Sequence, residues 1–404
     1  MKENKTKPDI RFKGFTEAWE QRKFSKLVTI ERGGSPRPID EFITKDENGL
    51  NWVKIGDAPE QGNYITQTAE KIKPEGLSKT REVHPGDLIL SNSMSFGRPY
   101  IMAIDGCIHD GWLAIRDTEK RFDLKFLCTL LGTNNMLNQY KAMAAGSTVN
   151  NLNKELVGGT IVSYPNTAEQ IKVGMYFEQL DSLITLHQRE CDQLKELKKS
   201  MLKKMFPRDG SSIPEVRFAG FTDAWEQRKL GEVGSVSMCR RIFKEQTSES
   251  GDIPFYKIGT FGGQADAYIS RELFAEYRSK YPYPKEGDIL ISASGSIGRT
   301  VEFTGKNEYF QDSNIVWLSH DDRLDNTFLK YFYSVVKWAG IEGSTIKRLY
   351  NDNILNTVIS MPSVAEQRKI GTFFKKLDNL ITLHQRELEI LKNLKKTCLK
   401  RMFI

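Results

Sequence analysis

The side chains of this chain that could do chemistry are cations, amides and hydroxyls on loops rich in glycine, serine and proline. Three such loops occur in each half of the chain. Arginine forks and amides can bond the edges of bases, whereas cations and hydroxyls suit phosphate oxygens. Each residue also has a plain alternative, because Ser/Asn/Gly loops are often turns and loop arginines are often only solvated. The candidates for nucleic-acid contact are Arg32, Arg37, Asn92, Ser93, Arg98, Tyr100, Ser147, Thr148 and Asn150 in the first half, and Arg240, Arg241, Lys244, Ser294, Arg299, Ser344, Thr345, Lys347 and Arg348 in the second.

The sequence lacks the motifs that would indicate catalysis. It contains no N-P-P-[FYW] word or glycine-rich cofactor loop of a DNA methyltransferase, no H-E-x-x-H, no Walker A loop and no convincing carboxylate–lysine cluster of a nuclease. The five cysteines are scattered without a C-x-x-C pair, which is poor spacing for zinc or for disulfides. We therefore expect no catalytic residue, no metal ligand and no cofactor on this chain.

Length and composition fit a globular protein of two to three domains, since the chain has 404 residues, 39% of them hydrophobic and 27% charged. The polar segment 1–10 is expected to be a flexible tail rather than a secretory signal. No apolar run approaches the roughly 18 residues of a membrane span, so we expect a cytoplasmic protein without membrane contact. The net charge of +7 permits a polyanionic partner without requiring one.

An internal repeat organises the whole chain. RFKGFTEAWEQRKF at 11–24 recurs as RFAGFTDAWEQRKL at 217–230, and most of the segment 168–206 recurs unchanged at 365–403. The stretches between these blocks diverge but keep shared words, such as PGDLILSNSMSFGRPY against EGDILISASGSIGRTV. One framework with different loops indicates two copies of a reading device with different targets. Gene duplication followed by drift is the alternative.

The sequence motifs shared by the two halves predict an α+β fold in both. Short apolar runs such as GDLIL, IVSYP and ILISA have the length of strands. A helix is expected near 123–145 and another near 325–341.

The repeated blocks predict two long helices. Each begins with a capping signal, Asn166 with Glu169 and Ser363 with Glu366, in which the first side chain accepts from the N3 amide and the glutamate reaches back. Apolar residues then recur three and four positions apart, which predicts a seam against a partner helix. The seam residues are Phe177, Leu180, Ile184, His187 and Leu194 in the first helix, and Phe374, Leu377, Ile381, His384 and Leu391 in the second.

The partner of each helix is expected to be the other copy, packed antiparallel. About 37 residues at 1.5 Å each give a rod of roughly 55 Å, or about 16 base pairs. The rod could act as a ruler, although heptads alone also fit a coiled coil that only dimerises or scaffolds. His187 and His384 lie at seam positions in the repeated word LITLHQRE, where packing is favoured over a ligand or a switch. Lysines crowd the last turns of both helices, where they suit the helix dipole or a phosphate equally well.

The order of these motifs resembles the specificity subunit of type I restriction–modification systems. The pieces are AWEQRK at 18–23 and 224–229, GDLILS and GDILIS, GST at 146–148 and 343–345, AEQ at 168–170 and 365–367, and LD-x-LITLHQRE in both helices. No single motif is decisive, but their order recurs in both halves and covers essentially the whole chain.

The resemblance implies an α+β chain with two pseudo-symmetric target-recognition domains, joined by two long helices that form an antiparallel coiled coil. Each domain would read one half of a bipartite, asymmetric site in double-stranded DNA. The helices would set the gap and dock two modification (methyltransferase) subunits, and two restriction (helicase–nuclease) subunits would complete the nuclease. S-adenosylmethionine, ATP and Mg²⁺ would then belong to those partners. The expected division is a tail at 1–10, a first domain at 11–167, a central helix at 168–206, a linker at 207–216, a second domain at 217–364 and a C-terminal helix at 365–404.

Two other functions stay open at this point, a stand-alone DNA-binding regulator and a coiled-coil scaffold. The sequence has no clear helix-turn-helix or zinc-finger pattern that would favour a regulator. Two divergent domains argue against a pure scaffold.

Overall fold

A computed structural model describes residues 6–92, 96–144, 152–208, 211–340 and 348–404. The chain divides into two compact units that do not follow the order of the sequence. Unit 1 combines Met1–Glu190 with His384–Ile404, and unit 2 is Cys191–Leu383. Within the described ranges, no helix is both long and apolar enough to span a membrane.

Unit 1 is built on two five-stranded sheets and a two-stranded ribbon. The described strands lie in the order β2-β11-β8-β9-β5 in the first sheet, β3-β6-β4-β10-β7 in the second and β1-β12 in the ribbon. Among them, β5–β9 and β4–β10 pair in parallel. Their bounds are β1 Glu20–Lys23, β2 Thr29–Arg32, β3 Ile43–Thr44, β4 Leu50–Val53, β5 Tyr64–Ile65, β6 Glu70–Ile72, β7 Arg81–Val83, β8 Leu88–Ser91, β9 Pro99–Met102, β10 Gly106–Ile108, β11 Trp112–Arg116 and β12 Ile161–Tyr164.

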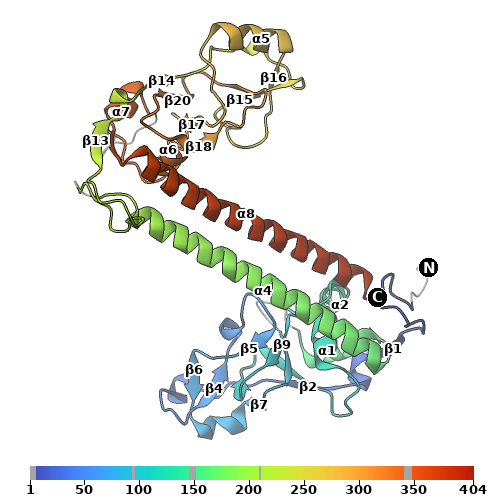
Figure 1. Ribbon diagram of the computed structural model, residues 1–404. Helices are drawn as coiled ribbons and strands as arrows, with labels where there is room; N and C mark the ends of the chain where they lie inside the picture. The colour runs from blue at the N-terminus through green and yellow to red at the C-terminus, as the bar shows by residue number, and fades with distance from the viewer. Residues whose placement is uncertain (1–5, 93–95, 145–151, 209–210, 341–347) are drawn as a thin grey trace. The chain divides into compact units, whose positions relative to one another are not determined.

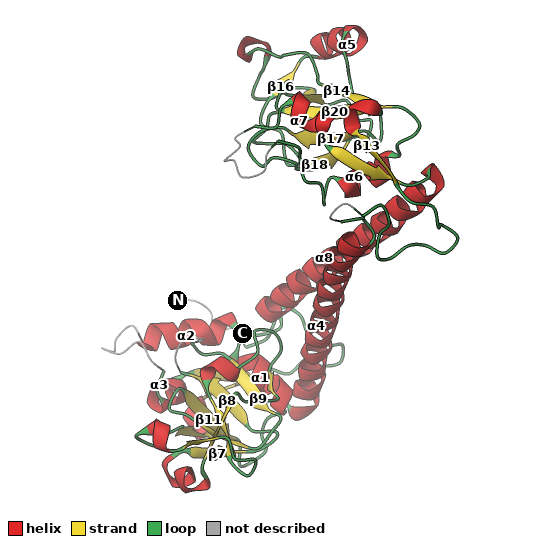
Figure 2. Cartoon of the chain, turned by 90° about the vertical axis from the view of Figure 1, so that its left-hand side faces the viewer, coloured by secondary structure: helices red, strands yellow, loops and turns green. Residues whose placement is uncertain are grey.

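The central strands of the first sheet are buried on both faces. Leu88 and Leu90 of β8 pack into the core that holds α1 (Leu124–Leu131), while Ile89 packs with Trp112 on the opposite face. Figure 2 shows β8, β9 and β11 lying together with α1 beside them. Because successive side chains of a strand point to opposite faces, burial on both sides explains why Leu88, Ile89 and Leu90 form a continuous apolar run.

Unit 2 repeats this arrangement with fewer strands. The orders are β14-β20-β17-β18, β16-β15-β19 and β13-β21, with β15–β19 in parallel. Leu290 of β17 faces one core while Ile289 and Ile291 face the other, as in the first copy. The bounds are β13 Glu226–Lys229, β14 Gly234–Ser237, β15 Ile253–Tyr256, β16 Tyr268–Ile269, β17 Ile289–Ser292, β18 Thr300–Glu302, β19 Tyr309–Phe310, β20 Ile315–His320 and β21 Val358–Met361. The α+β expectation is confirmed, and GDLIL, ILISA and IVSYP are strands.

The predicted short helices are each interrupted or shortened. The helix expected near 123–145 breaks after Leu131, because Gly132 ends α1 and the Thr133 hydroxyl accepts from Met136 N–H to start α2. The helix expected near 325–341 ends at Phe332. The remaining α-helices are α2 Asn134–Ala144, α3 Lys154–Gly159, α4 Thr167–Lys204, α5 Arg271–Lys280, α6 Asn326–Phe332, α7 Asn351–Asn356 and α8 Val364–Arg401.

The start of α4 is fixed by one half of the predicted capping box. Asn166 Oδ1 accepts from Glu169 N–H at 3.0 Å, as predicted. The Glu169 carboxylate, however, does not reach back along the chain, because it forms two hydrogen bonds of 2.8 and 2.6 Å with the Arg11 guanidinium. The pair is nearly buried, and the pKa of Arg11 is raised by its hydrogen bond to Glu169.

The same arrangement fixes α8. Glu366 binds Arg217 at 2.9 and 2.7 Å, while Ser363 Oγ accepts from Glu366 N–H at 3.4 Å. In both copies the repeated RF segment is therefore clamped to the first turn of a long helix. The reach-back of the two glutamates was the wrong part of the capping prediction.

In each unit, part of α4 packs antiparallel against part of α8 (Figure 1). In unit 1, Asp181 pairs with Lys395 and His187 lies against His384. In unit 2, Lys198 Nζ lies 2.5 Å from Asp378 Oδ1. Lys395 and Lys198, which occupy equivalent positions in the two helices, thus each pair with an aspartate of the opposite helix.

Candidate nucleic-acid interface

Two of the candidate loops of unit 1, the one at 31–40 and the one that follows β8, meet at Asp110, in the turn between β10 and β11. Ser35 Oγ donates to Asp110 Oδ1 at 2.9 Å, and the Arg37 guanidinium lies 4.0 Å from Asp110 Oδ2. Arg32 Nε donates to the Asp110 carbonyl at 3.4 Å, and Asn92 Nδ2 donates to the same carbonyl at 2.8 Å. The turn therefore gathers side chains that lie far apart in the sequence.

Described residues from all three candidate loops of unit 2 contact the equivalent turn, Asp312–Asn314. Arg241 Nε lies 3.0 Å from Asp312 Oδ2, and Ser294 Oγ donates to Asn314 Oδ1 at 2.8 Å. Arg348 donates to the Ser313 carbonyl at 2.8 Å and forms a β-bridge with Ser294. The two units thus assemble different side chains around equivalent aspartates, Asp110 and Asp312.

Two of these arginine side chains, Arg37 and Arg241, are largely exposed to solvent. The Arg37 side chain is 83% exposed and that of Arg241 is 61% exposed. Arg37 can exchange its contact with the half-exposed Asp110 carboxylate for a base edge or a phosphate at small cost, since exposed ion pairs contribute only about 0–1 kcal/mol. Arg241 is also free to reach a base or a phosphate, although the Asp312 side chain that it contacts is only 15% exposed. They are the best placed candidates among the described residues.

Two other candidates, Tyr100 and Asn92, are buried and contact other residues of their own domain. Tyr100 is 1% exposed, and its ring packs edge-to-face on Trp112 with 5.6 Å between centroids, so its prediction as a DNA contact was wrong. Burial also raises the pKa of Tyr100. Asn92 is 3% exposed and supports the Asp110 turn rather than facing solvent, so it too leaves the set of direct contacts. Tyr100 lies in the buried strand β9, and Asn92 follows directly after the buried strand β8, which the loop composition did not reveal.

Arg98 and Arg299 anchor neighbouring loops in their own units. Arg98 donates to the carbonyls of Glu60 and Gly62 at 2.9 and 3.2 Å, and Arg299 donates to the Gly262 carbonyl at 3.4 Å. The guanidinium of Arg98 also lies over the Tyr100 ring, 5.0 Å from its centroid. Equivalent contacts in both copies indicate a shared structural task.

Unit 2 carries aromatic residues that sequence reasoning missed. Arg240 lies over the ring of Tyr281, 5.1 Å from its centroid, beside the exposed side chain of Phe243. These three residues, with Arg241, help to line a hollow of about 460 Å³. Exposed rings next to arginine suit apolar contact with a base. The motif RRIFK at 240–244, in which Phe243 follows two arginines, was the sequence feature that could have indicated this site. Lys244 at the end of the motif is exposed.

A basic hollow in unit 1 adjoins the end of α8. It measures about 740 Å³, and cations and asparagines supply much of its wall. This arrangement suits a phosphate, one of the two roles open for the lysines at the helix ends. The cations are Arg98, Lys392, Lys395, Lys396 and Lys400, and the asparagines are Asn63, Asn134, Asn135 and Asn138.

Several candidates cannot be placed, because Ser93, Ser147, Thr148, Asn150, Ser344, Thr345 and Lys347 lie outside the described residues. The helix seam is described throughout. Phe177, Leu180, Phe374, Leu377 and Ile381 are buried, while Ile184, Leu194 and Leu391 are half-buried. His187 and His384 contact one another through their ring nitrogens rather than by packing alone.

A family model described as the type I restriction modification DNA specificity domain matches the chain twice, over residues 16–196 and 222–393. A Haemophilus influenzae chain described as a type I restriction enzyme specificity subunit is 60% identical over 153 residues, which make up 38% of this chain and 40% of that relative. The type I restriction enzyme MjaIX specificity subunit of Methanocaldococcus jannaschii is 22% identical over 413 residues, with coverage of 95% and 92%.

Two solved structures share the fold. The S subunit of a type I restriction–modification system from M. genitalium aligns with a TM-score of 0.63 at 16% identity, covering 98% of this chain and 99% of its own. A chain from a study of complex assembly and conformational transition of the type I R-M system aligns with a TM-score of 0.51 at 18% identity, covering 95% and 97%. The twofold match of the family model over most of the sequence shows that this chain belongs to the type I restriction–modification specificity subunit family, with two DNA recognition domains.

Proposed function

We propose that this chain selects a bipartite, asymmetric DNA site for a type I restriction–modification complex, each domain reading one half-site. The observation that carries the proposal is the pair of equivalent turns at Asp110 and Asp312. In each unit the turn gathers exposed arginines and polar side chains from separate loops, but the residues gathered differ. One framework with different donor sets is what two different half-sites require.

The chain would itself perform no chemistry and would dock two modification and two restriction subunits. Leucines at equivalent positions support this part of the proposal. Leu183 and Leu186 on α4 are 43% and 49% exposed, and Leu380 and Leu383 on α8 are 43% and 50% exposed. Apolar side chains that stay exposed at the same places in both copies fit a protein interface. S-adenosylmethionine, ATP and Mg²⁺ would be held by those partners.

The two long helices would set the gap between the half-sites. Each has 38 residues, which corresponds to about 57 Å of helix. Ion pairs between α4 and α8 oppose sliding, because a shift of one helix along the other would separate Lys198 from Asp378.

Genome-wide mapping of methylated adenines tests the proposal. The chain is expressed with a matching modification subunit in a host that lacks other DNA methylation. One split motif with a fixed gap, which disappears when this chain is omitted, is the expected result. A complex that forms and methylates without any sequence preference would contradict the specificity role. Failure to bind the modification subunit, with DNA binding retained, would point to a stand-alone regulator instead.

A further inference from the structure

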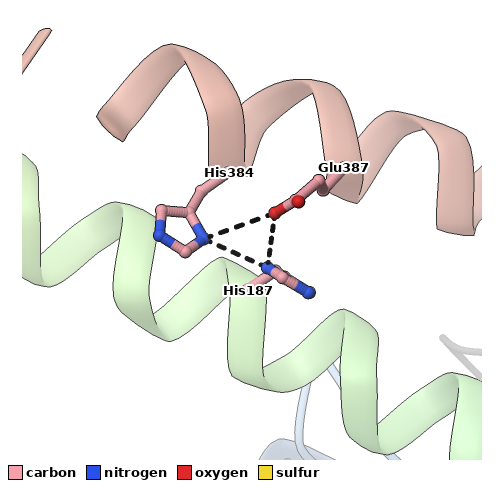
Figure 3. Close-up of side chains that lie close together, drawn as sticks. All are labelled: His187, His384 and Glu387. Atoms are coloured by element: carbon pink, nitrogen blue, oxygen red, sulfur yellow. Dashed lines mark hydrogen bonds and ion pairs between the residues drawn. The ribbon is translucent and has the colours of Figure 1, made fainter. Parts of the chain in front are cut away.

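Two histidines and two glutamates meet where α4 and α8 pack together in unit 1. The Nδ1 atoms of His187 and His384 are 3.1 Å apart. Glu387 Oε2 lies 3.3 Å from His187 Nδ1 and 3.8 Å from His384 Nδ1. Glu190 Oε2 lies 3.2 Å from His384 Nδ1 and 3.8 Å from His187 Nδ1. Figure 3 shows three of these side chains pointing toward one another from the two helices.

The separation between the two histidine nitrogens, and those between each histidine and each glutamate, are close to the ligand–ligand distances of a tetrahedral metal site. Metal–nitrogen and metal–oxygen bonds of about 2.0–2.1 Å place neighbouring tetrahedral ligands about 3.3 Å apart. Each glutamate forms a triangle with both histidines whose sides fall between 3.1 and 3.8 Å. Among the described residues, it is here, at His187, His384 and Glu387, that three His, Cys, Asp or Glu side chains place their ligand atoms close enough together to hold a metal ion.

The helix geometry brings the ligands together twice. His187 with Glu190, and His384 with Glu387, are three residues apart and so share one helix face. The repeated word HQRE places the same pair in both copies, and antiparallel packing sets the two pairs against each other. The histidine side chains are about 20% exposed and the glutamates about 40%, which leaves access for the ion and for water.

We propose that His187, His384, Glu190 and Glu387 bind one divalent transition-metal ion, preferentially Zn²⁺, that clamps α4 to α8. Imidazole nitrogen with carboxylate oxygen suits Zn²⁺ and its neighbours in the first row better than Mg²⁺ or Ca²⁺. Because the ligands come from both helices, the ion stabilises their pairing in this register. From the sequence we predicted that the histidines pack in the seam and that the chain has no metal ligand. The pattern of apolar residues did not indicate that a glutamate of the opposite helix would lie beside each histidine.

The test uses the full chain without a histidine tag, stripped with a chelator and titrated with Zn²⁺ and, separately, Co²⁺. One equivalent of each metal should bind, Co²⁺ should show the visible absorption of a low-symmetry site, and Tm should rise with Zn²⁺. Substituting His187→Gln with His384→Gln should abolish all three effects. Glu190→Gln with Glu387→Gln should weaken Zn²⁺ binding by more than the roughly tenfold that an outer-shell partner costs.

His84→Gln is the matched control, because His84 also contacts a carboxylate, Asp105, at 2.7 Å but lies on an exposed loop. It should bind Zn²⁺ as the unmodified chain does. Circular dichroism in chelator checks that every variant is folded, and the glutamate variant, whose changes are isosteric, serves if the histidine variant is not. The proposal is overturned if the stripped chain binds no Zn²⁺ or Co²⁺, or if the folded variants bind them as tightly as the unmodified chain.

Discussion

At the residue scale, Asp110 and Asp312 explain how loop arginines can be presented to DNA without being locked in place. Arg37 is held loosely, at 4.0 Å, and Arg241 more closely, at 3.0 Å. Because both partners of the Arg37–Asp110 pair are exposed, this pair contributes little to stability and its loss on binding costs little. The pair nevertheless restricts where the guanidinium lies, which lowers the entropy lost when a base or phosphate replaces the carboxylate.

Replacing these arginines separately should affect the two half-sites separately. Arg37→Ala should weaken discrimination in one half-site and Arg241→Ala in the other, by about 1–3 kcal/mol if each reads a base. Binding by the assembled methyltransferase to duplexes altered in one half-site measures this. Arg22→Ala is the control, since Arg22 is exposed and pairs with Glu20 away from the turn. An equal loss on every duplex with a weaker salt dependence would instead identify a phosphate contact.

His109, beside Asp110, should make the first domain sensitive to mild acid. Burial lowers the pKa of His109 below its ordinary value of 6.5. The unfolded chain therefore binds a proton at a higher pH than the folded chain does. Stability from the neutral ring is fully present above about pH 6.5 and is lost as the pH falls below it.

Urea unfolding from pH 8 to pH 5 checks this, comparing the unmodified chain with His109→Gln. The variant should lose less stability on acidification. His84→Gln is an informative control, because the hydrogen bond to Asp105 raises the pKa of His84 and gives its contribution the opposite sign. Parallel pH profiles for the unmodified chain and His109→Gln would refute the assignment.

At the element scale, the AEQ motif joins the start of each long helix to its domain. Besides the glutamate–arginine clamp, Gln170 accepts from Asp123 N–H at 3.0 Å, and Gln367 accepts from Asp325 N–H at 2.8 Å. These aspartates are the N-caps of α1 and α6. Breaking one side of such a nearly buried ion pair typically costs about 3–5 kcal/mol. The motif therefore fixes how a domain sits on its own helix.

Sequence patterns predicted the secondary-structure elements better than they predicted which distant residues those elements contact. The long helices, their caps and the seam could be predicted because period and capping are local properties. Glu169 was assigned to the wrong partner because Arg11 lies 158 positions away, a separation that local pattern does not encode. Tyr100 was misassigned for a related reason, since its position in a buried strand mattered more than the loop before it. α5 was not predicted at all, and the first copy has no α-helix in the same place.

Lengthening α4 and α8 should change the gap between the two half-sites but leave the sequences of the half-sites unchanged. One heptad inserted after Glu190 and one after Leu383 fall at the boundary between the units and leave the contacts inside each unit intact. Seven residues add about 10.5 Å, or about three base pairs. Methylome sequencing should return the same two half-site sequences with a longer gap. An active complex with an unchanged gap would rule out the helices as the spacer.

At the scale of the whole molecule, the contacts between α4 and α8 are reciprocal. Asp181 pairs with Lys395, and the equivalent Asp378 pairs with Lys198. His187 contacts its own equivalent, His384, which is what a local pseudo-twofold axis requires. Each compact unit correspondingly combines one domain with parts of both helices. The two variable segments therefore occupy equivalent frameworks and should be interchangeable.

Placing the second variable segment in both positions is the sharpest test of this equivalence. In a chain whose residues 29–167 are replaced by a copy of 235–364, Phe328 would take the place of Phe126 against Trp19, as it already packs against Trp225. The clamp of Arg11 on Glu169 lies outside the exchanged segment and would remain. A twofold arrangement of identical readers should convert the asymmetric motif into an inverted repeat of the second half-site. If both halves of the motif instead acquired new sequences, the domains would not be independent readers.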